Sequence, residues 1–487
     1  MLLPRLPLEV FSRGAAYPDP CPAPCVVAEN SGNTQQVSLC NDTAGDCGIR
    51  PGMKLGAARA LAANLIVFDR DPELEAEALK SIATWAGQFS SYISLADSIS
   101  GPDAVLLEVE GSVKLFGDLS ALLQQAQGGI AALGYDARLA VAPTPLASRL
   151  LARSRWLRGS QSSPVVVTQS EKLIPSLGRL PVSFLEFDNK TAQALSGMGI
   201  DTIADCLRLP RDGLARRFGK AFLYKLDRLT GKLADPLPAF TPPHKFYSRI
   251  DLPAEVEEVE ALLFALQRLL LELQGFLLAR GAGVQQLDIE LKHRGFVTRL
   301  SLAMLTPGRS AEKLLMLARE RFARLQLEAP VLEIAVRADT VCELEEATTD
   351  LFGHGKEEDN LLGLLERLRA RLGNESVQGV YPIAEHRPEY AWRFGEPGER
   401  DESVNDHERP LWILPTPMRL QQKRGRPMLH GQLHLYPDRE RIESGWWDGG
   451  DVRRDYFIAH DYRQSRYWIF RDLDDVSGNW YLHGIFE

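Results

Sequence analysis

The chain contains few cysteines, no long uninterrupted apolar run and no excess of basic residues. Its six cysteines among 487 residues are too few and too scattered for a disulfide framework. Four of them have C-x3-C and C-x6-C spacings, which are not typical of zinc sites, so we expect thiols and no metal. A membrane helix needs roughly 18 consecutive apolar residues, and polar side chains interrupt the densest stretch, 261–278. Because the first residues form no basic and apolar leader, we expect a soluble, cytoplasmic protein with no membrane partner.

The net charge of −9, from 56 basic and 65 acidic residues, excludes a histone-like protein that coats nucleic acid through bulk charge. Local basic patches stay compatible with DNA binding, because affinity for phosphate depends on where Lys and Arg cluster. No G-x-x-x-x-G-K-[ST] segment occurs, so the chain has no P-loop, and we expect no cofactor. The nine histidines suggest no Ser/His/Asp constellation. His293 fits a DNA-facing strand better than a catalytic base.

Length and periodicity predict an α+β protein of several domains. At about 100–200 residues per domain, the length corresponds to two to four. Short apolar strands alternate with helices up to about residue 170, and short helices punctuated by Gly and Pro follow. A charged linker and an aromatic β-rich module, with six of the eight tryptophans after residue 390, end the chain. The later elements that we expect are helices at 256–280, 310–325 and 360–372, strands at 286–294, 297–305 and 331–338, and a hairpin within 456–470.

A glycine-containing turn and a basic run follow each other in the region of short helices. Residues 195–200 read Leu-Ser-Gly-Met-Gly-Ile, and glycines at this spacing allow a tight turn that presents backbone N–H groups to an anion. An ordinary turn between helices is the alternative. Residues 206–232 contain eight Lys and Arg against two Asp, which indicates either phosphate contacts or a solvated helix face. The candidate DNA-binding residues are Gly197, Gly199, Arg211, Arg216, Arg217, Lys220 and Lys225.

In this order, the segments resemble the Y-family translesion DNA polymerases over about residues 1–345. Residues 48–53, Gly-Ile-Arg-Pro-Gly-Met, are similar to the family's G-[VI]-R-x-G-M fingers segment. Residues 106–112, Leu-Leu-Glu-Val-Glu-Gly-Ser, resemble its palm strand Y-L-D-V-T-G-S, and residues 199–219 resemble its thumb pattern G-I-x-T-[IL], L-P and R-F-G. The resemblance implies palm and fingers over 1–172, a helix-hairpin-helix thumb over 173–243, a little finger over 244–342, a linker over 343–375 and a C-terminal β-rich module over 376–487.

The residues that carry the family's chemistry are largely missing. That chemistry needs carboxylates that hold two metal ions about 3.5–4 Å apart. The first-strand D-x-D-x-F-F segment corresponds to residues 2–7, which contain no acid, and the consecutive Asp-Glu pair falls on Asp103 and Ala104. We therefore treat Asp103, and Glu108 further along the same strand, as vestigial and expect no catalytic residue. The Tyr and Arg that clamp the triphosphate fall on Asp42 and Gly45, where an acid would repel phosphate.

A retained scaffold with a lost site resembles the ImuB-type proteins, the polymerase-like members of the bacterial SOS mutasome. Residues 4–9 are similar to that group's P-x-L-P-L-E opening, and residues 441–450, Arg-Ile-Glu-Ser-Gly-Trp-Trp-Asp-Gly-Gly, and 482–486 resemble its tail. A strand and turn with two tryptophans in the core of the module would also explain residues 441–450.

The resemblance implies a non-catalytic adaptor in SOS-induced translesion synthesis and DNA repair. Its partners would be primer-template or damaged DNA, the sliding clamp, an error-prone C-family DNA polymerase and a RecA-like accessory protein. One alternative is an active DNA-directed DNA polymerase with an altered metal site of Asp103, Glu108 and Glu110, since Glu108 and Glu110 share a strand face by period two. Another is a stand-alone sensor of DNA structure.

A short linear motif in the linker resembles sliding-clamp ligands of the form Q-L-[SD]-L-F. Such ligands place Leu and Phe in an apolar pocket of the partner. Residues 348–352 read Thr-Thr-Asp-Leu-Phe, with Thr where Gln is expected. The alternatives are residues 432–436, Gln-Leu-His-Leu-Tyr, which alternate like a strand, and local packing. The candidate clamp-binding residues are Thr348, Asp350, Leu351 and Phe352.

Overall fold

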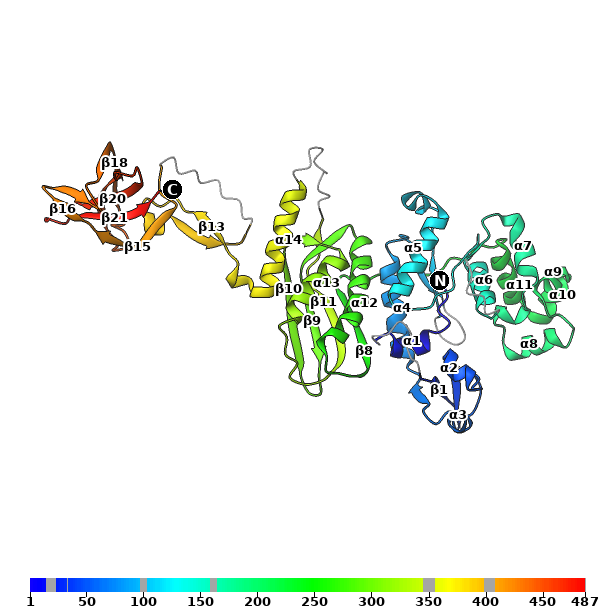
Figure 1. Ribbon diagram of the computed structural model, residues 1–487. Coiled ribbons are helices and arrows are strands. Elements are labelled where there is room, and N and C mark those ends of the chain that lie inside the picture. The colour runs from blue at the N-terminus through cyan, green and yellow to red at the C-terminus, as the bar shows by residue number, and fades with distance from the viewer. Residues whose placement is uncertain are drawn as a thin grey trace. The chain divides into compact units, whose positions relative to one another are not determined.

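The computed structural model describes residues 1–14, 23–32, 34–96, 103–157, 164–344, 355–397 and 408–486. It separates into two compact units, Met1–Gly355 and Lys356–Glu487 (Figure 1). The first unit combines helices and sheets, and the second contains one helix longer than one turn followed by strands, so the predicted α+β class with a β-rich C-terminal part is confirmed.

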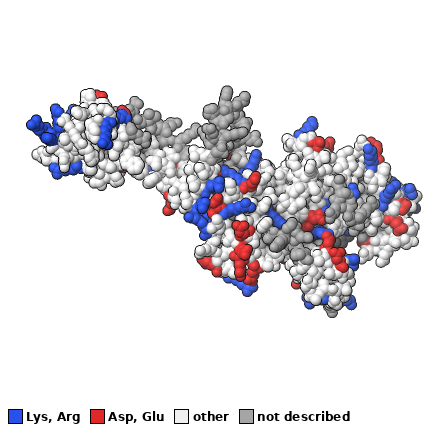
Figure 2. Space-filling model, in the orientation of Figure 1, with Lys and Arg blue, Asp and Glu red and all other residues white. Residues whose placement is uncertain are grey.

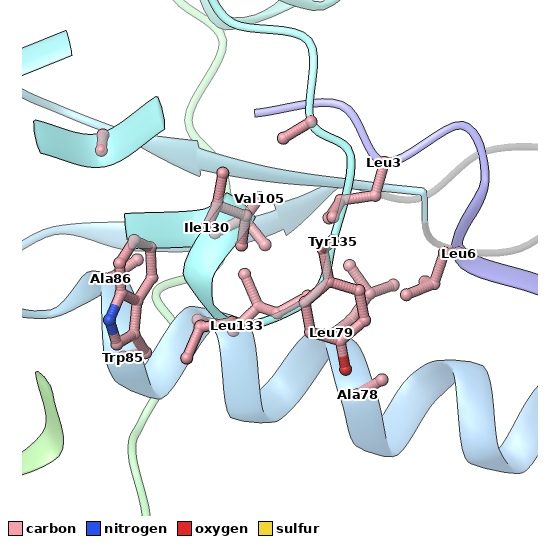
Figure 3. Packing of buried hydrophobic residues seen from close by; sticks show 14 of the residues in the cluster. Leu3, Leu6, Ala78, Leu79, Trp85, Ala86, Val105, Ile130, Leu133 and Tyr135 are labelled. Atoms are coloured by element: carbon pink, nitrogen blue, oxygen red, sulfur yellow. The ribbon is translucent and has the colours of Figure 1, made fainter. Parts of the chain in front are cut away.

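A helical layer under short strands forms the first core. Helix α4, Pro72–Ala86, begins after Asp71, whose side chain accepts hydrogen bonds from the N–H groups of Glu73 and Leu74 at 3.0 Å. Figure 3 shows Leu79 and Trp85 of this helix facing apolar side chains of the strands and of α5. Each fully buried side chain of this kind contributes about 1.5–3 kcal/mol. The palm elements are α1 Leu6–Ser12, α4, β4 Ile93–Ala96, β5 Ala104–Leu107, the 3-10 helix Val113–Phe116, α5 Leu119–Ala132, β6 Ala140–Val141, α6 Pro145–Leu157 and β7 Val165–Val166.

The fingers form a small three-stranded sheet. Strand β1, Cys25–Ser31, pairs antiparallel with β2, Thr34–Cys40, and parallel with β3, Ile66–Asp69. Helices α2, Asp42–Asp46, and α3, Leu55–Leu61, accompany this sheet. Strands β1 and β3 are among the short apolar strands expected before residue 170, whereas the mostly polar sequence of β2 shows no such signal.

Short helices build the thumb. The buried side chains of its core come from α6 as well as from the helices after residue 170, so α6 joins the palm sheet to the thumb. Thr202 and Asp205 form a capping box that begins α9. The thumb elements are α7 Ser170–Gly178, the 3-10 helix Val182–Leu185, α8 Asn189–Ser196, α9 Ile203–Arg208, α10 Arg211–Phe218 and α11 Lys220–Thr230.

The little finger is a sheet of strand order β10-β9-β11-β8, with a short strand β12 at β9. The region opens with strand β8 rather than with the helix we expected, and the helix begins only at Val259. Phe246, Ser248 and Ile250 alternate inward along β8, but Pro253 near its end obscures the pattern. The elements are β8 Phe246–Val256, α12 Val259–Leu278, β9 Ala282–Lys292, β10 Val297–Gly308, α13 Ala311–Phe322, β11 Val331–Ala338 and β12 Cys342–Glu343.

Helix α12 fastens the little finger to the palm. Gly275 lies against Trp85 of α4, and a Cβ there would be 2.4 Å from the indole ring, so this crossing requires glycine. The guanidinium of buried Arg13 lies 2.5 Å from the carboxylate of buried Glu272. By length and composition α12 could cross a membrane, but more than half of that stretch is buried inside the protein, as in a core helix.

The second unit contains a five-stranded antiparallel sheet of order β15-β21-β20-β19-β18. The predicted aromatic hairpin is confirmed, with Tyr456 opposite Phe470 and Ile458 opposite Trp468. The elements are α14 Gly355–Leu372, the 3-10 helices Asn374–Ser376 and Pro388–Tyr390, β13 Gly379–Pro382, β14 Trp392–Gly395, β15 Trp412–Arg419, β16 Gln421–Lys423, β17 Arg426–Met428, β18 His434–Ser444, β19 Val452–His460, β20 Arg466–Asp472 and β21 Trp480–Ile485.

The two tryptophans of residues 441–450 lie outside the core, contrary to the packing interpretation. Trp446 is 78% exposed and Trp447 is 57% exposed. The chain turns at Gly445, whose φ is +91°, and buried Arg387 donates to both carboxylate oxygens of Asp448 at 3.0 and 2.7 Å. The turn is therefore held at the surface by an ion pair.

Candidate nucleic-acid interface

The place where the resemblance puts two catalytic carboxylates is apolar in this structure. Leu2 pairs with both Ala104 and Arg138, which places it between β5 and the strand segment before β6. Leu2, Ala104 and Ala152 of α6 are each at most 3% exposed and form one buried cluster. Side chains without oxygen donors cannot hold the hard divalent cations that phosphoryl transfer uses.

The remaining acid, Asp103, is paired with a cation of the protein. Nη2 of Arg149, on α6, lies 3.1 Å from the Asp103 carboxylate and 3.5 Å from that of Glu186. Burial raises the pKa of Asp103, and the guanidinium of Arg149 opposes that shift. Sequence reasoning missed Arg149 and its neighbour Arg153, which also pairs with Glu186, although their i, i+4 spacing marks a basic face of α6.

The acids of the altered-site hypothesis are not brought together. Glu108 and Glu110 lie beyond the end of β5 and are exposed, and Oε1 of Glu108 accepts the N–H of Glu110 at 2.8 Å. Asp103 precedes the same strand, so about 16 Å of extended chain separates it from Glu108. In the described part of the chain, no three His, Cys, Asp or Glu side chains gather as a metal site would require. The residues present therefore do not fit a pair of catalytic metal ions.

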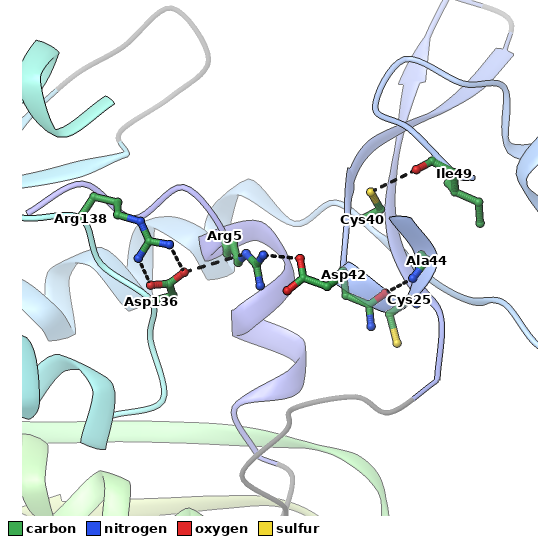
Figure 4. A network of polar contacts seen from close by, with 9 residues as sticks. Arg5, Cys25, Cys40, Asp42, Ala44, Ile49, Asp136 and Arg138 are labelled. Atoms are coloured by element: carbon green, nitrogen blue, oxygen red, sulfur yellow. Dashed lines mark hydrogen bonds and ion pairs between the residues drawn. The ribbon is translucent and has the colours of Figure 1, made fainter. Parts of the chain in front are cut away.

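Asp42, at a position where the resemblance puts the triphosphate clamp, belongs to a chain of ion pairs (Figure 4). The guanidinium of Arg5 lies 2.5 Å from the carboxylate of Asp42 and 4.0 Å from that of Asp136, which also pairs with Arg138. Arg5 is therefore already shared between two acids.

The helix-hairpin-helix turn forms as predicted, but its two glycine N–H groups are already used. Gly197 donates to the carbonyl of Gln193 and Gly199 to that of Ser196, both at 2.9 Å. The φ of Gly199 is +71°, and no atom lies within 4 Å of where its Cβ would be. The turn thus leaves open space for a ligand, while the expected presentation of these two N–H groups is not seen.

The basic residues of the thumb fall into two groups. Arg211 donates to both carboxylate oxygens of Asp227, at 2.8 and 2.6 Å, which raises its pKa. Lys225 donates to the carbonyl of Glu186 at 3.2 Å, and burial lowers its pKa. These two side chains are engaged within the thumb.

Arg216, Arg217 and Lys220 form the second group, at the junction of α10 and α11. All three are exposed, and none forms an ion pair with any residue that the structure describes. They flank Gly219, whose φ of +84° turns the chain between the helices. We call residues 216–220 the basic junction, and it is the strongest phosphate-binding candidate in the thumb.

A cavity of about 690 Å³ lies between α6, α11 and the 3-10 helix of residues 182–185. Its walls include Arg149, Arg153, Lys225 and Arg228 together with Glu186 and Asp235. The cations are largely balanced by carboxylates, so this space belongs to the ion-pair system around Asp103.

The predictions for His293 and for the clamp motif have different outcomes. His293 is buried, and its ring nitrogens lie 3.1 Å from the carbonyl of Pro330 and 3.0 Å from the hydroxyl of Thr298, so the DNA-facing interpretation is wrong. The clamp motif at 348–352 lies outside the described residues and stays a prediction. In its rival, Leu433 is 1% exposed and belongs to the core of the second unit.

Comparison with known proteins shows which family the chain resembles. The family model of the impB/mucB/samB family matches residues 21–153. DNA polymerase IV of a Shewanella species is 28% identical over 203 residues, 40% of this chain and 52% of that protein. Two solved structures align at low similarity. DinB from Sulfolobus solfataricus is 20% identical and aligns over 66% of this chain and 93% of its own, with a TM-score of 0.35. An insertion ternary complex of Dbh DNA polymerase is 18% identical and aligns over 70% of this chain and 98% of its own, with a TM-score of 0.40. The chain is thus similar to the impB/mucB/samB family over residues 21–153 and to DNA polymerase IV over 40% of its length.

A second relative matches almost the whole chain and is named ImuB. The chain is similar to this protein ImuB of Caulobacter vibrioides, with 26% identity over 481 residues that cover 90% of this chain and 100% of that protein. Because the match covers 90% of the chain, it includes part of the C-terminal unit as well as the polymerase-like unit, and it supports the predicted resemblance to the ImuB-type proteins.

Proposed function

We propose that this chain is a non-catalytic, DNA-binding adaptor in error-prone translesion synthesis and DNA repair. The observation that carries the proposal is the buried apolar cluster of Leu2, Ala104 and Ala152 at the place of the catalytic carboxylates. Next to this cluster, the guanidinium of Arg149 forms an ion pair with Asp103. The basic junction stays exposed. This combination is suited to holding DNA rather than to extending it.

The relatives support the DNA-directed part of this proposal, since some of them are named DNA polymerase IV. The resemblance to ImuB-type proteins supports SOS-induced action in the bacterial cytoplasm, with the sliding clamp, an error-prone C-family polymerase and a RecA-like accessory protein as partners. The active-polymerase alternative requires Asp103 and Glu108 in one site, and these acids lie at opposite ends of β5.

A bridging assay tests the adaptor role. Primer-template DNA carrying a loaded clamp is immobilised, and retention of a C-family polymerase is measured with and without this chain. We expect the chain to increase retention, and the variant Arg216→Glu, Arg217→Glu, Lys220→Glu to lose most of that increase. Equal retention with and without the chain would contradict the adaptor role.

A further inference from the structure

The second unit carries a two-stranded hairpin whose tip is basic. Strands β16 and β17 are joined through Arg424 and Gly425, both in the left-handed region with φ of +53° and +76°. Two residues with positive φ form the tight turn that matches the twist of a hairpin. The tip is fixed from below, because the indole N–H of Trp480 donates to the carbonyl of Gly425 at 3.4 Å and Gln422 donates to that of Gly478 at 3.2 Å.

The tip carries only positive charge. Lys423, Arg424 and Arg426 are exposed, and none forms an ion pair with a residue that the structure describes. In the sequence, no Asp or Glu occurs between Glu408 and Asp438. Figure 2 shows blue side chains gathered at the end of the second unit where Figure 1 labels β16.

One cross-strand pair of the hairpin places two positive charges opposite each other, which disfavours folding. Lys423 lies directly opposite Arg426 in the antiparallel register, so the two cations share one face. Like charges in directly opposite positions destabilise a sheet. Asp475, in the loop before Trp480, accepts hydrogen bonds from Ser477 and Asn479 and forms no ion pair with Lys423 or Arg426. An external anion at the tip would offset this repulsion.

We propose that this hairpin is a second DNA-binding element, which places its tip in a groove of duplex DNA and contacts the phosphate backbone. A two-stranded β-ribbon fits the major groove, which is about 12 Å wide, and Lys and Arg at its tip neutralise phosphates. Three free cations at the end of a fixed ribbon meet a regular row of phosphates better than the scattered carboxylates of a protein surface. The contact goes beyond the proposed function, because it lies in a different unit from the thumb.

The test is binding of the full chain to a short fluorescent DNA duplex, measured as a function of salt. The variant Lys423→Gln, Arg426→Gln removes two cations, so the salt slope should fall by about 0.9 for each lost contact and affinity near 0.1 M salt should fall by tens of fold. The matched control is Arg324→Gln, Arg463→Gln, which also removes two exposed arginines and should bind like the parent chain. Equal loss in the control and the hairpin variant would overturn the proposal.

A variant that binds DNA more tightly separates a direct contact from misfolding, which could explain only a loss of binding. Gln421 lies two residues before Lys423 on the same face of the hairpin and is exposed. Gln421→Lys should therefore tighten duplex binding several-fold and steepen the salt slope, which a misfolded protein would not do. Unchanged duplex binding in both hairpin variants would overturn the proposal. Tip-dependent binding of poly-glutamate, without any effect on duplex DNA, would also overturn it and assign the hairpin to an acidic protein.

Discussion

The guanidinium of Arg149 lies 3.1 Å from the carboxylate of Asp103, the one acid that remains of the expected metal site. Arg149 on α6 thus pairs with a carboxylate at a position where the resemblance to polymerases implies a metal ligand. Because Arg149 also lies 3.5 Å from Glu186, the same side chain ties the palm to the thumb. The neighbouring positions, Leu2 and Ala104, contribute to stability through burial and supply no donor atoms.

Removing this cation should destabilise the fold. Arg149→Ala leaves Asp103 half-buried without its partner, so we expect the free energy of unfolding to fall by about 1–3 kcal/mol at pH 7. Chemical denaturation measures the effect. In an Asp103→Asn background the same change should cost less, because no charge is then stranded. Equal costs in both backgrounds would show that the ion pair contributes nothing.

Charge reversal of the basic junction should weaken DNA binding. The variant Arg216→Glu, Arg217→Glu, Lys220→Glu should bind primer-template less tightly, with a salt slope lower by about one for each lost phosphate contact. Arg211→Gln, Lys225→Gln is the comparison, because these side chains are engaged within the thumb and should change the slope little. Salt-dependent fluorescence anisotropy distinguishes the two variants. If the second variant has the larger effect, the assignment of the interface is wrong.

Buried Glu9 should make stability fall as pH rises. Burial raises its pKa to about 8, although its Oε1 accepts the N–H of Asp136 at 2.8 Å. Between its ordinary pKa near 4.5 and pH 8, the folded state holds a proton that the unfolded chain has lost. Over this range the free energy of unfolding therefore falls by up to about 1.4 kcal/mol for each unit by which the pH rises.

The variant Glu9→Gln keeps a side-chain oxygen that can accept the N–H of Asp136, and it removes the pH-dependent loss of stability because an amide does not titrate. Its gain in stability over the parent chain should be largest at pH 8 and vanish near pH 4.5. Urea denaturation at both pH values measures the gain, with exposed Glu110→Gln as the control. A gain that is the same at both pH values would contradict the buried-carboxyl account.

Helices and strands with strong periodicity were predictable, and the pairing of charges was not. α4 and the hairpin of β19 and β20 follow from caps and alternation. The end of β5 at Leu107 was missed, because Val109 continues the apolar alternation after the pairing with β4 has ended. The partner of Asp103 lies 46 positions away on another element, and no local pattern identifies it. The basic hairpin shows in the sequence only as a long interval without acids.

The clamp motif is tested by removing its two anchors. Leu351→Ala, Phe352→Ala should abolish binding to the sliding clamp and leave DNA affinity unchanged, because short linear ligands draw most of their energy from such anchors. A pull-down and a melting curve on the same variant separate clamp binding from local packing. Retained clamp binding would leave the segment at 432–436 as the candidate, in which Leu435 and Tyr436 are exposed and Leu433 is buried.

The absence of catalysis is the central claim, and primer extension tests it most directly. The purified chain is incubated with primer-template DNA, all four nucleotides and either Mg²⁺ or Mn²⁺, on damaged and undamaged templates, beside an active Y-family polymerase. The apolar cluster at Leu2 and Ala104 and the Arg149–Asp103 pair predict no nucleotide incorporation. Template-dependent extension that disappears in Asp103→Ala would contradict the account.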